Sequence, residues 1–248
     1  RADRGFEFTQ LDLEMSFVSM RDVMNTVEEI VKHAVNSVGG KLKDCTFPVI
    51  NYQDAMQKYG ADKFDLRSDI EKKENVLAFA WVVNFPFFKK VNTKDAAEVA
   101  DGKSGWTFTH NPFSCPIDDH LQWHLKGENV DKIIAAQYDL VCNGYEVGGG
   151  SIRAHRPDVL KATYKIMGYT DEQTEDGIAH MLEAFRLGTP PHGGIALGLD
   201  RLVMLLSGES SLKEAIAFPM SSTGRTAVMD APSRVSDGQL KELGIKIV

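Results

Sequence analysis

The sequence feature that most constrains the fold is the Asn143-Gly144 pair, which lies between two apolar runs. Asn-Gly in this setting is the strongest short-range signal of a β-hairpin, because both central residues of a type I′ turn need positive φ angles. A two-residue turn fixes the register. It predicts Val141 opposite Glu146 and Asp139 opposite Gly148, so that Asp139 and Glu146 project from the same face of the hairpin.

Two carboxylates on one face repel each other unless they bind a cation or face water. The segment between Asp139 and Glu146 contains no Lys or Arg. The pair therefore predicts a divalent metal site, and hard oxygen ligands suit Mg²⁺ that bridges to phosphates. A glycine-rich edge hairpin with solvated charges is the alternative that these residues leave open.

Three consecutive glycines, 148–150, follow Glu146. Glycine weakens a strand because it loses more conformational entropy and packs less, so this run predicts that another group, such as a ligand, approaches the backbone closely. Arg153 lies seven positions after Glu146, and in a regular strand the two would face opposite ways. We therefore predict a β-bulge within residues 148–150, at Gly149 or Gly150, that turns Arg153 to the face of Glu146. There its guanidinium can hold a carboxylate through two parallel hydrogen bonds.

Composition narrows the class of protein. The chain has 248 residues, of which 43% are hydrophobic and 25% charged, which suits one large globular domain or two small ones. Its formal net charge of −7 argues against a general DNA-binding protein. Three cysteines without CxxC spacing favour a reducing compartment, and no apolar run reaches the roughly 18 residues of a membrane span. We expect a cytoplasmic protein with no membrane and no DNA partner.

Residue periodicity predicts the main elements. Apolar and polar residues alternate from Phe6 to Phe17, which indicates a strand. One face of it carries Phe8, Asp12 and Glu14, and this sequence of aromatic and acidic side chains suits the floor of a ligand site. Helical spacing of apolar residues predicts helices over 20–38, 52–59, 158–167 and 171–187, and residues 68–75 form a polar connector.

A second candidate site is the strand-to-helix turn Gly198-Leu199-Asp200-Arg201. Gly198 allows close approach of a ligand to the backbone, and Arg201 lies in the first turn of a helix whose free amides favour anions. The turn therefore predicts a phosphate site. The alternative left open is that Asp200 only caps the helix and that Arg201 is a surface residue.

Several motifs carry a resemblance to a known family. Gly-Leu-Asp-Arg-Leu at 198–202 resembles motif 3 of the class II aminoacyl-tRNA synthetases, and residues 1–17 resemble the loop and second strand of their motif 2. Gly-Tyr-Glu-Val-Gly-Gly-Gly-Ser-Ile-Arg at 144–153 and Asp-Lys-Phe-Asp-Leu-Arg at 62–67 resemble the bacterial-type aspartyl-tRNA synthetases in particular. Lysyl- and asparaginyl-tRNA synthetases share motif 3. The resemblance covers essentially the whole chain.

The resemblance implies a fold and a reaction. The fold is an α+β catalytic domain over residues 1–248, in which helices flank a six- or seven-stranded antiparallel sheet. The reaction is the ATP-dependent ligation of L-aspartate to tRNA(Asp) through an aspartyl-adenylate, with charging of tRNA(Asn) left open. Two alternatives remain: a synthetase paralog that adenylates an amino acid without charging tRNA, and a non-catalytic module derived from a synthetase.

The resemblance also assigns residues to roles. It implies catalytic roles for Arg201 and Glu146 and a Mg²⁺ site at Asp139 and Glu146. It implies that ATP is bound by Phe8, Glu146, Gly198, Leu199, Asp200 and Arg201. It implies that L-aspartate is bound by His110, Arg153 and Asp12, the last near the α-amino group. Arg1 and Arg4 would contact the tRNA acceptor end.

The chain departs from the family pattern at four places. Asn111 stands where the family usually has a second His after His110, and Gly5 stands where bacterial enzymes often have Gln. The connector at 68–75 stands where those enzymes carry an inserted domain. The chain begins at Arg1, within motif 2. We therefore expect an N-terminally truncated catalytic domain that is inactive alone and belongs to a longer, homodimeric enzyme.

Overall fold

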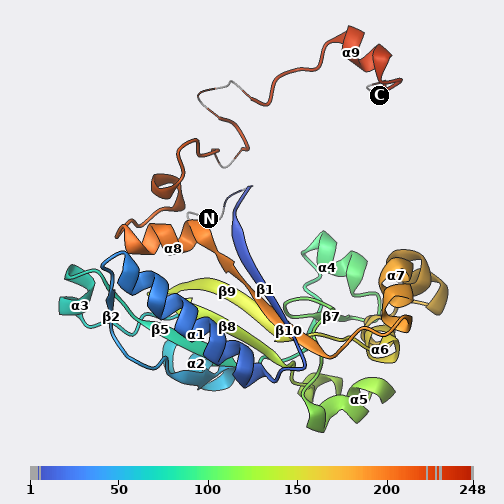
Figure 1. The fold of residues 1–248 in the computed structure, drawn as a ribbon. Coiled ribbons are helices and arrows are strands. Elements are labelled where there is room, and N and C mark those ends of the chain that lie inside the picture. Colours follow the sequence, from blue (N-terminus) through green and yellow to red (C-terminus); the bar gives the residue numbers. More distant parts are fainter. Residues whose placement is uncertain (1–4, 6, 222, 227, 229–230, 247–248) are drawn as a thin grey trace. The chain divides into compact units, whose positions relative to one another are not determined.

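The computed structural model describes residues 5, 7–221, 223–226, 228 and 231–246 (Figure 1). Contacts within the chain divide it into two compact units. The larger runs from Gln10 to Gly198, and the smaller combines Arg1–Thr9 with Leu199–Val248. The single catalytic domain over residues 1–248 expected from the sequence stays a prediction.

A six-stranded sheet forms the centre of the larger unit. Its spatial order is β1 (Gln10–Ser16), β10 (His192–Gly198), β9 (Tyr145–Ile152), β8 (Gln137–Cys142), β5 (Phe79–Val83) and β3 (Val49–Asn51). Neighbouring strands are antiparallel except β3 and β5, which pair in parallel. The α+β class is therefore confirmed, but the sheet is mixed. The expected antiparallel sheet has one parallel pair, β3 with β5, at its edge.

The β8–β9 hairpin turns at Asn143-Gly144, as the sequence predicts. The φ angles of these two residues are 52° and 90°, which only a pair such as Asn-Gly adopts at low cost. The Asn143 side chain also fixes the turn to β4 (Val76–Leu77) and the residue after it. Its Oδ1 accepts from the Ala78 amide at 2.9 Å and its Nδ2 donates to the Val76 carbonyl at 3.1 Å.

Helices cover both faces of the sheet. The helix α1 (Met20–Ser37) begins at a capping box formed by Ser19 and Asp22 and buries Val23, Val27 and Val31. Figure 1 shows it lying across the sheet. The helix α2 (Tyr52–Tyr59) packs Ala55 against a cluster that includes Ala80 and Val82 of β5.

The rest of the larger unit consists of short elements and three further helices. The short elements are β2 (Lys41–Leu42), α3 (Asp69–Lys73), β6 (Phe88–Lys90), α4 (Ala96–Asp101), β7 (Trp106–Phe108), η1 (Asp118–His120) and η2 (Val130–Lys132). The further helices are α5 (Leu121–Lys126), α6 (Pro157–Met167) and α7 (Asp171–Arg186). The strand predicted from Phe6 is paired only from Gln10 onward, and Phe6 lies outside the described residues.

The smaller unit contains α8 (Leu199–Leu206), η3 (Leu212–Ala215) and α9 (Asp237–Glu242). Within it, the Leu199 amide donates to the Thr9 carbonyl at 2.9 Å. Within the described part of the chain, no helix combines the length and apolar character needed to cross a membrane.

Candidate active site

A β-bulge in β9 sets the geometry of the site. Val141 pairs with Glu146 as predicted, but Leu140 pairs with Gly148 and Asp139 with Gly149. One residue of β9, Val147, is therefore extra. The prediction that Asp139 lies opposite Gly148 is wrong by one residue, and the bulge lies just before the three glycines and not at Gly149 or Gly150. A bulge reverses the alternation of faces beyond it.

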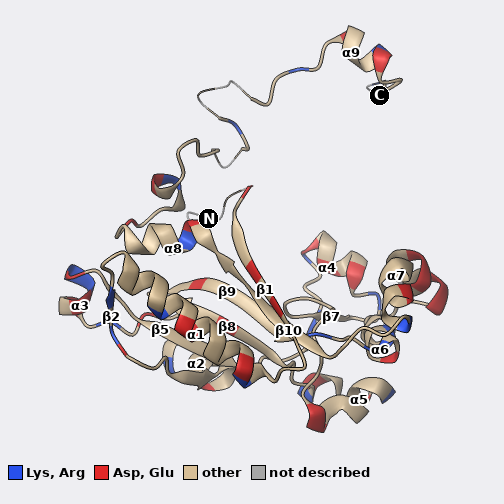
Figure 2. Ribbon diagram, in the orientation of Figure 1, with Lys and Arg blue, Asp and Glu red and all other residues tan. Residues whose placement is uncertain are grey.

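The bulge brings Glu146 and Arg153 to one face of the sheet, as required by the odd spacing between them. Residues directly opposite on antiparallel strands share a face, and two neighbouring rows of such residues cross the sheet. One row contains Asp12, Ala196, Gly149 and Asp139, and the other contains Glu14, Gly194, Ser151 and Gln137. We call the polar side chains on this face the polar floor: Asp12, Glu14, Gln137, Asp139, Glu146, Ser151 and Arg153. Figure 2 shows the acidic stretch that β1 contributes.

Asp139 and Glu146 converge above Gly149. A methyl group on Gly149 would lie 3.2 Å from Asp139 Oδ1 and 3.3 Å from Glu146 Oε1. Asp139 is buried, and burial together with the charge of Glu146 raises the pKa of its carboxyl well above the usual value. Oδ1 accepts from Gln137 Nε2 at 3.1 Å, whereas Oδ2 has no partner among the described residues. The predicted shared face of the two carboxylates is confirmed.

A cation that the hairpin itself lacks reaches this pair from another segment. Lys63 Nζ lies 2.7 Å from Glu146 Oε2. Lys63 belongs to the Asp-Lys-Phe-Asp-Leu-Arg motif, 83 positions before Glu146 in the chain. The hairpin itself contains no cation beside the two carboxylates, as the sequence indicates. In the folded chain, however, Lys63 supplies one.

Arg153 lies on the polar floor and is engaged by two side chains. Its Nη1 donates to Ser151 Oγ at 3.0 Å and its Nη2 donates to Glu14 Oε1 at 2.6 Å. The Arg153 side chain is 21% exposed and that of Glu14 is 42% exposed. The guanidinium thus already holds one carboxylate, which comes from β1. Alternation along β1 predicts Glu14 on the same face as Asp12, but the family motifs give Glu14 no role.

His110 follows β7 and is partly buried. Its ring packs edge-on against Phe85, with 4.6 Å between the ring centroids. Burial lowers the pKa of His110, and the charges of Glu146 and Asp62 oppose this shift. The imidazole is therefore neutral at pH 7 and shares its electrostatic surroundings with Glu146.

Asn111, the departure from the family pattern, has a local structural role. Its Oδ1 accepts from the Phe113 amide at 2.9 Å and from Ser114 Oγ at 3.2 Å. An asparagine that bonds to the backbone two residues on stabilises a turn. Its side chain is therefore committed to the loop that follows His110.

The three glycines are approached by protein groups. A methyl group on Gly150 would lie 2.2 Å from the Gly194 carbonyl oxygen and 2.7 Å from the Tyr138 ring, and one on Gly148 would lie 2.6 Å from Leu197 Cδ2. The expectation of a close approach is confirmed. At Gly148 and Gly150 the approaching groups are strand β10 and Tyr138, and at Gly149 they are the two carboxylates.

The second candidate site occupies the turn between β10 and α8. Asp200 Oδ2 accepts from the Thr9 amide at 2.8 Å, so its carboxylate fixes the segment before β1. Phe8 is 63% exposed, and Leu199 is 47% exposed. Arg201 lies in the first turn of α8 and is partly buried. Gly198 ends β10 opposite Gln10.

Arg1 and Arg4, expected to contact tRNA, lie outside the described residues. The ATP assignments fall in both units: Glu146 and Gly198 belong to the larger one, and Phe8, Leu199, Asp200 and Arg201 to the smaller one. The structure brings together Asp12, Asp139, Glu146 and Arg153 on one face, and it adds Glu14, Gln137 and Lys63, which the motifs did not single out.

Comparison of the sequence with known proteins identifies a family and several individual relatives. The family described as tRNA synthetases class II (D, K and N) matches residues 1–222. An aspartate–tRNA(Asp/Asn) ligase of Phenylobacterium zucineum is 32% identical over 373 aligned positions, which cover 100% of this chain and 61% of that protein. An aspartate–tRNA ligase of Macrococcus caseolyticus is 30% identical, again over 100% of this chain and 61% of the relative. The chain thus spans about three fifths of the length of these relatives.

Solved structures share the fold. An aspartyl-tRNA synthetase from Entamoeba histolytica superposes with a TM-score of 0.63 at 20% identity, over 90% of this chain and 45% of that one. The asparaginyl-tRNA synthetase of the same organism, in complex with asparaginyl-adenylate, gives 0.60 at 21% identity, over 88% and 48%. The family match over nearly nine tenths of the sequence shows that the chain belongs to the class II tRNA synthetases of the D, K and N group.

Proposed function

We propose that the protein ligates L-aspartate to tRNA(Asp) in two steps. The α-carboxylate of aspartate attacks the α-phosphate of ATP and releases pyrophosphate, and the tRNA 3′ hydroxyl then attacks the aspartyl carbonyl and releases AMP. The observation that carries this proposal is the placement of one guanidinium, Arg153, on the same face as the convergent carboxylates Asp139 and Glu146. A site for an acidic amino acid and a site for a metal-bound phosphate then share one floor.

Arg153 would select the side-chain carboxylate of aspartate. Its guanidinium carries five N–H donors, and Ser151 and Glu14 each engage one nitrogen. The remaining donors are available to a second carboxylate. The Glu14 side chain is 42% exposed, so water can solvate it when substrate takes over part of the contact. A lysine side chain would meet the guanidinium with like charge, and a neutral asparagine amide would form weaker hydrogen bonds than a carboxylate.

Asp12 would hold the α-amino group of the same substrate. It lies two residues before Glu14 and on the same face of β1. A carboxylate there attracts the ammonium group of a bound amino acid, while Arg153 attracts the far end. The two groups together fix the substrate by its opposite charges and hold the α-carboxylate free for reaction, which is the positioning that in-line attack needs.

The donor set suits Mg²⁺. Among the described residues no group of three or more His, Cys, Asp or Glu side chains is arranged around a metal ion. Mg²⁺ in nucleotide sites commonly takes one or two protein carboxylates and completes its shell with water and phosphate oxygens. Asp139 and Glu146 supply two carboxylates, and the buried Asp139 Oδ2 has no hydrogen-bond partner among the residues that the structure describes. When bound there, Mg²⁺ would neutralise charge on the phosphates of ATP.

Lys63 and His110 would adjust the charge of this floor. Lys63 offsets the negative charge of Glu146 at 2.7 Å, and a metal ion at Glu146 would compete with it. His110 is neutral at pH 7 because burial lowers its pKa, so it adds no positive charge and is able to hydrogen-bond a substrate carboxylate. Arg201 and Phe8 would hold the phosphates and adenine of ATP, by the roles that their motifs have in the family.

The names of the relatives support both tRNA(Asp) and tRNA(Asn) as acceptors. We propose charging of tRNA(Asp) and leave tRNA(Asn) as the finer question, which charging assays with the two tRNAs answer directly. Contacts of Arg1 and Arg4 with the acceptor end and assembly into a homodimer remain parts of the proposal. Sedimentation of the full-length protein checks the second.

The substitution Arg153→Leu tests the assignment of the substrate. Removing the guanidinium leaves both the substrate carboxylate and Glu14 without their partner. We expect kcat/KM for aspartate in pyrophosphate exchange by the full-length protein to fall about 100- to 1000-fold, as for loss of a desolvated charge pair. The matched control is Arg156→Leu, because Arg156 pairs with Asp158 at the surface and is 48% exposed; it should retain activity. An unchanged kcat/KM in the Arg153 variant would refute the assignment.

A further inference from the structure

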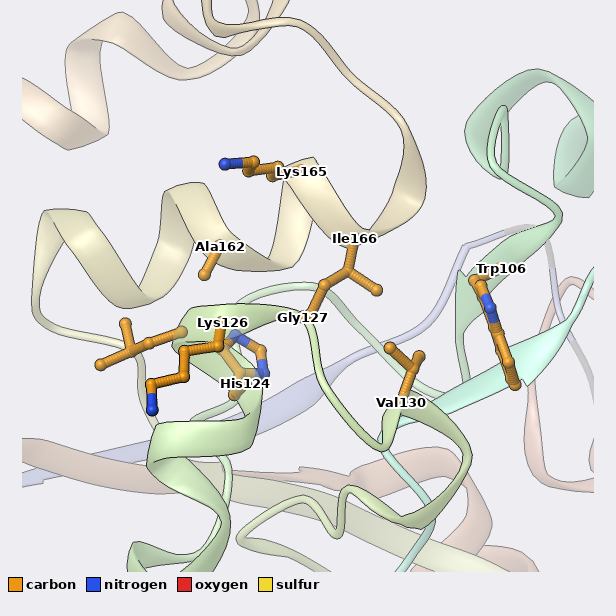
Figure 3. A pocket seen from close by; sticks show the side chains of 9 residues that line it. Trp106, His124, Lys126, Gly127, Val130, Ala162, Lys165 and Ile166 are labelled. Atoms are coloured by element: carbon orange, nitrogen blue, oxygen red, sulfur yellow. The ribbon is translucent and has the colours of Figure 1, made fainter.

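A cavity outside the polar floor lies between α5, α6 and β7. Its volume is about 310 Å³, at the lower end of the range of ligand pockets and enough for about ten waters at about 30 Å³ each. The cavity is lined by side chains from the two helices, from the loop that follows α5, and by Trp106 of β7 (Figure 3). No residue of the polar floor lines it.

The lining is apolar with two cations. Ala162 and Ile166 of α6 provide part of the apolar wall, and Lys126 and Lys165 provide the charge. No Asp or Glu is among the described residues that line the cavity, and neither lysine forms an ion pair with a described residue. Figure 3 shows both lysine amino groups on the side away from Trp106. The two lining lysines therefore lie at one end of the cavity and Trp106 at the other, where Lys90 Nζ lies 3.6 Å from the centroid of the Trp106 ring.

A buried histidine adds an unsatisfied polar group. The His124 side chain is fully buried and lines the cavity. Its Nε2 lies 2.9 Å from Thr163 Oγ1 and 3.2 Å from the Val159 carbonyl oxygen, whereas Nδ1 has no hydrogen-bond partner among the described residues. Burial lowers the pKa of His124 to about 4, so the ring is neutral at pH 7 and the positive charge of the cavity comes from the lysines.

The position of the lysines has a simpler explanation that the test must separate. Each lies in the last turn of its helix, where a cation interacts favourably with the helix dipole. That role accounts for the two positive charges at the ends of the helices. It does not account for an open cavity beside two ammonium groups that have no acidic partner in the described part of the chain, nor for the His124 Nδ1 that has no hydrogen-bond partner there.

We propose that this cavity binds a small monoanion with an apolar body, such as an arylalkyl carboxylate. The aromatic or aliphatic body lies against Trp106, Ala162 and Ile166, and the anionic group lies between Lys126 and Lys165. A neutral molecule of the same shape binds more weakly because it loses both ion pairs, and a cation is repelled. The site is separate from the one proposed for aspartate and ATP, and its test does not depend on catalysis.

The test is a titration of the protein with 4-phenylbutyrate, followed through the δ1 methyl groups of isoleucine by NMR. Ile166 lines the cavity and should shift with saturation, whereas Ile70 on α3, which is 71% exposed, should not. The uncharged 4-phenylbutanamide should bind about tenfold more weakly, because two exposed ion pairs are lost. Absence of a saturable shift at Ile166, or equal affinity for the acid and the amide, would overturn the proposal.

Charge variants locate the anionic group. Lys126→Gln and Lys165→Gln should each raise Kd for 4-phenylbutyrate about two- to fivefold, the range for exposed ion pairs, and leave Kd for the amide unchanged. Lys94→Gln is the matched control, because Lys94 is exposed and does not line the cavity; it should leave both constants unchanged. A loss of affinity as large in Lys94→Gln as in the other two would show non-specific attraction and refute the site. Methyl spectra of each variant also report whether it is folded.

Discussion

Burial of Asp139 in the folded protein is energetically unfavourable. Asp139 is a buried carboxylate beside a second carboxylate, and only one of its oxygens has a hydrogen-bond partner among the described residues. An unpartnered buried charge is unfavourable by itself. Titratable groups with a strongly shifted pKa concentrate at functional sites, which supports the proposal that this carboxylate binds a metal ion.

This cost predicts a pH-dependent effect of Asp139→Asn. The pKa of Asp139 is higher in the folded protein than in the unfolded chain. Its contribution to stability is therefore fully present below the unfolded pKa of about 3.9 and is lost as pH rises through the folded pKa. The amide does not titrate. We expect the variant to have a larger free energy of unfolding at pH 7, by roughly 1–3 kcal/mol, and this advantage to shrink toward acid pH.

Urea unfolding between acid and neutral pH measures the difference. Asp176→Asn is the control, because Asp176 is exposed on α7; its effect on the free energy of unfolding should be small. A variant at Asp139 that is less stable than wild type at pH 7, or equally shifted at every pH, would show that burial does not penalise this carboxylate.

At the scale of single residues, the sequence predicts which side chains lie on the site face better than it predicts which side chains they contact. The Asn-Gly turn places Asp139 and Glu146 on one face because a two-residue hairpin has a fixed register. The contact of Lys63 with Glu146 depends on tertiary folding across 83 positions, and no local period indicates it. Glu14 is a case that alternation along β1 does reveal, since it shares the face of Asp12, but its pairing with Arg153 becomes visible only when β1 lies beside β10.

At the scale of the elements, alanine substitutions at two adjacent glycines of β9 should affect stability differently. Gly150→Ala should lower the free energy of unfolding by roughly 3 kcal/mol or more, because its methyl group would lie 2.2 Å from a backbone oxygen of β10 that cannot move independently. Gly149→Ala meets only the ends of two side chains at 3.2 and 3.3 Å, so its stability should stay within about 1 kcal/mol of wild type. Stabilisation by added Mg²⁺ should nevertheless be lost.

Thermal unfolding with and without Mg²⁺ distinguishes these outcomes. Gly177→Ala on α7 is the control, because nothing lies within 4 Å of the added methyl group; alanine there should raise stability by up to about 1 kcal/mol. If Gly149→Ala still responds to Mg²⁺ like wild type, the carboxylates above Gly149 are not the metal site. If Gly150→Ala is as stable as wild type, close packing of β9 and β10 is not what requires glycine.

Among the secondary-structure elements, the sequence predicts those that are long enough to show a clear apolar period. The helix over 52–59 is found with its bounds, because its apolar spacing is clear and Gly60 ends it with a φ of 71°. The helices α3, α4 and α5 are missed, because five or six residues are too short to show a period. The bulge is predicted from the spacing of Glu146 and Arg153, but its position depends on packing of β9 against both neighbours.

At the scale of the whole molecule, the chain spans about three fifths of the length of the relatives it matches. The aligned stretch in the Phenylobacterium relative has 373 positions, more than the 248 residues of this chain, so the relative holds residues within it that this chain lacks. That these correspond to the connector at 68–75, where α3 now stands, remains a prediction. Because the chain covers 61% of this relative, the activity and partners of the whole protein are proposals.

For the whole molecule, the sequence predicts the family from the type and order of its motifs. Motif-like segments at 1–17, 144–153 and 198–202 indicate the family. In the sheet, strands β1 and β9 of the first two segments lie on either side of β10. The division into two units is not visible in the sequence, because contact density depends on which distant segments pack together. The parallel β3–β5 edge is hidden for the same reason.

The most direct test of the central claim is amino-acid-dependent exchange of pyrophosphate into ATP by the full-length protein, with aspartate, asparagine and lysine measured in parallel. The guanidinium on a floor with two metal-suited carboxylates predicts exchange that requires Mg²⁺ and aspartate, is abolished by Arg201→Ala, and is far slower with the other two amino acids. Exchange driven by lysine or asparagine and not by aspartate, or no exchange with any of the three, would contradict it.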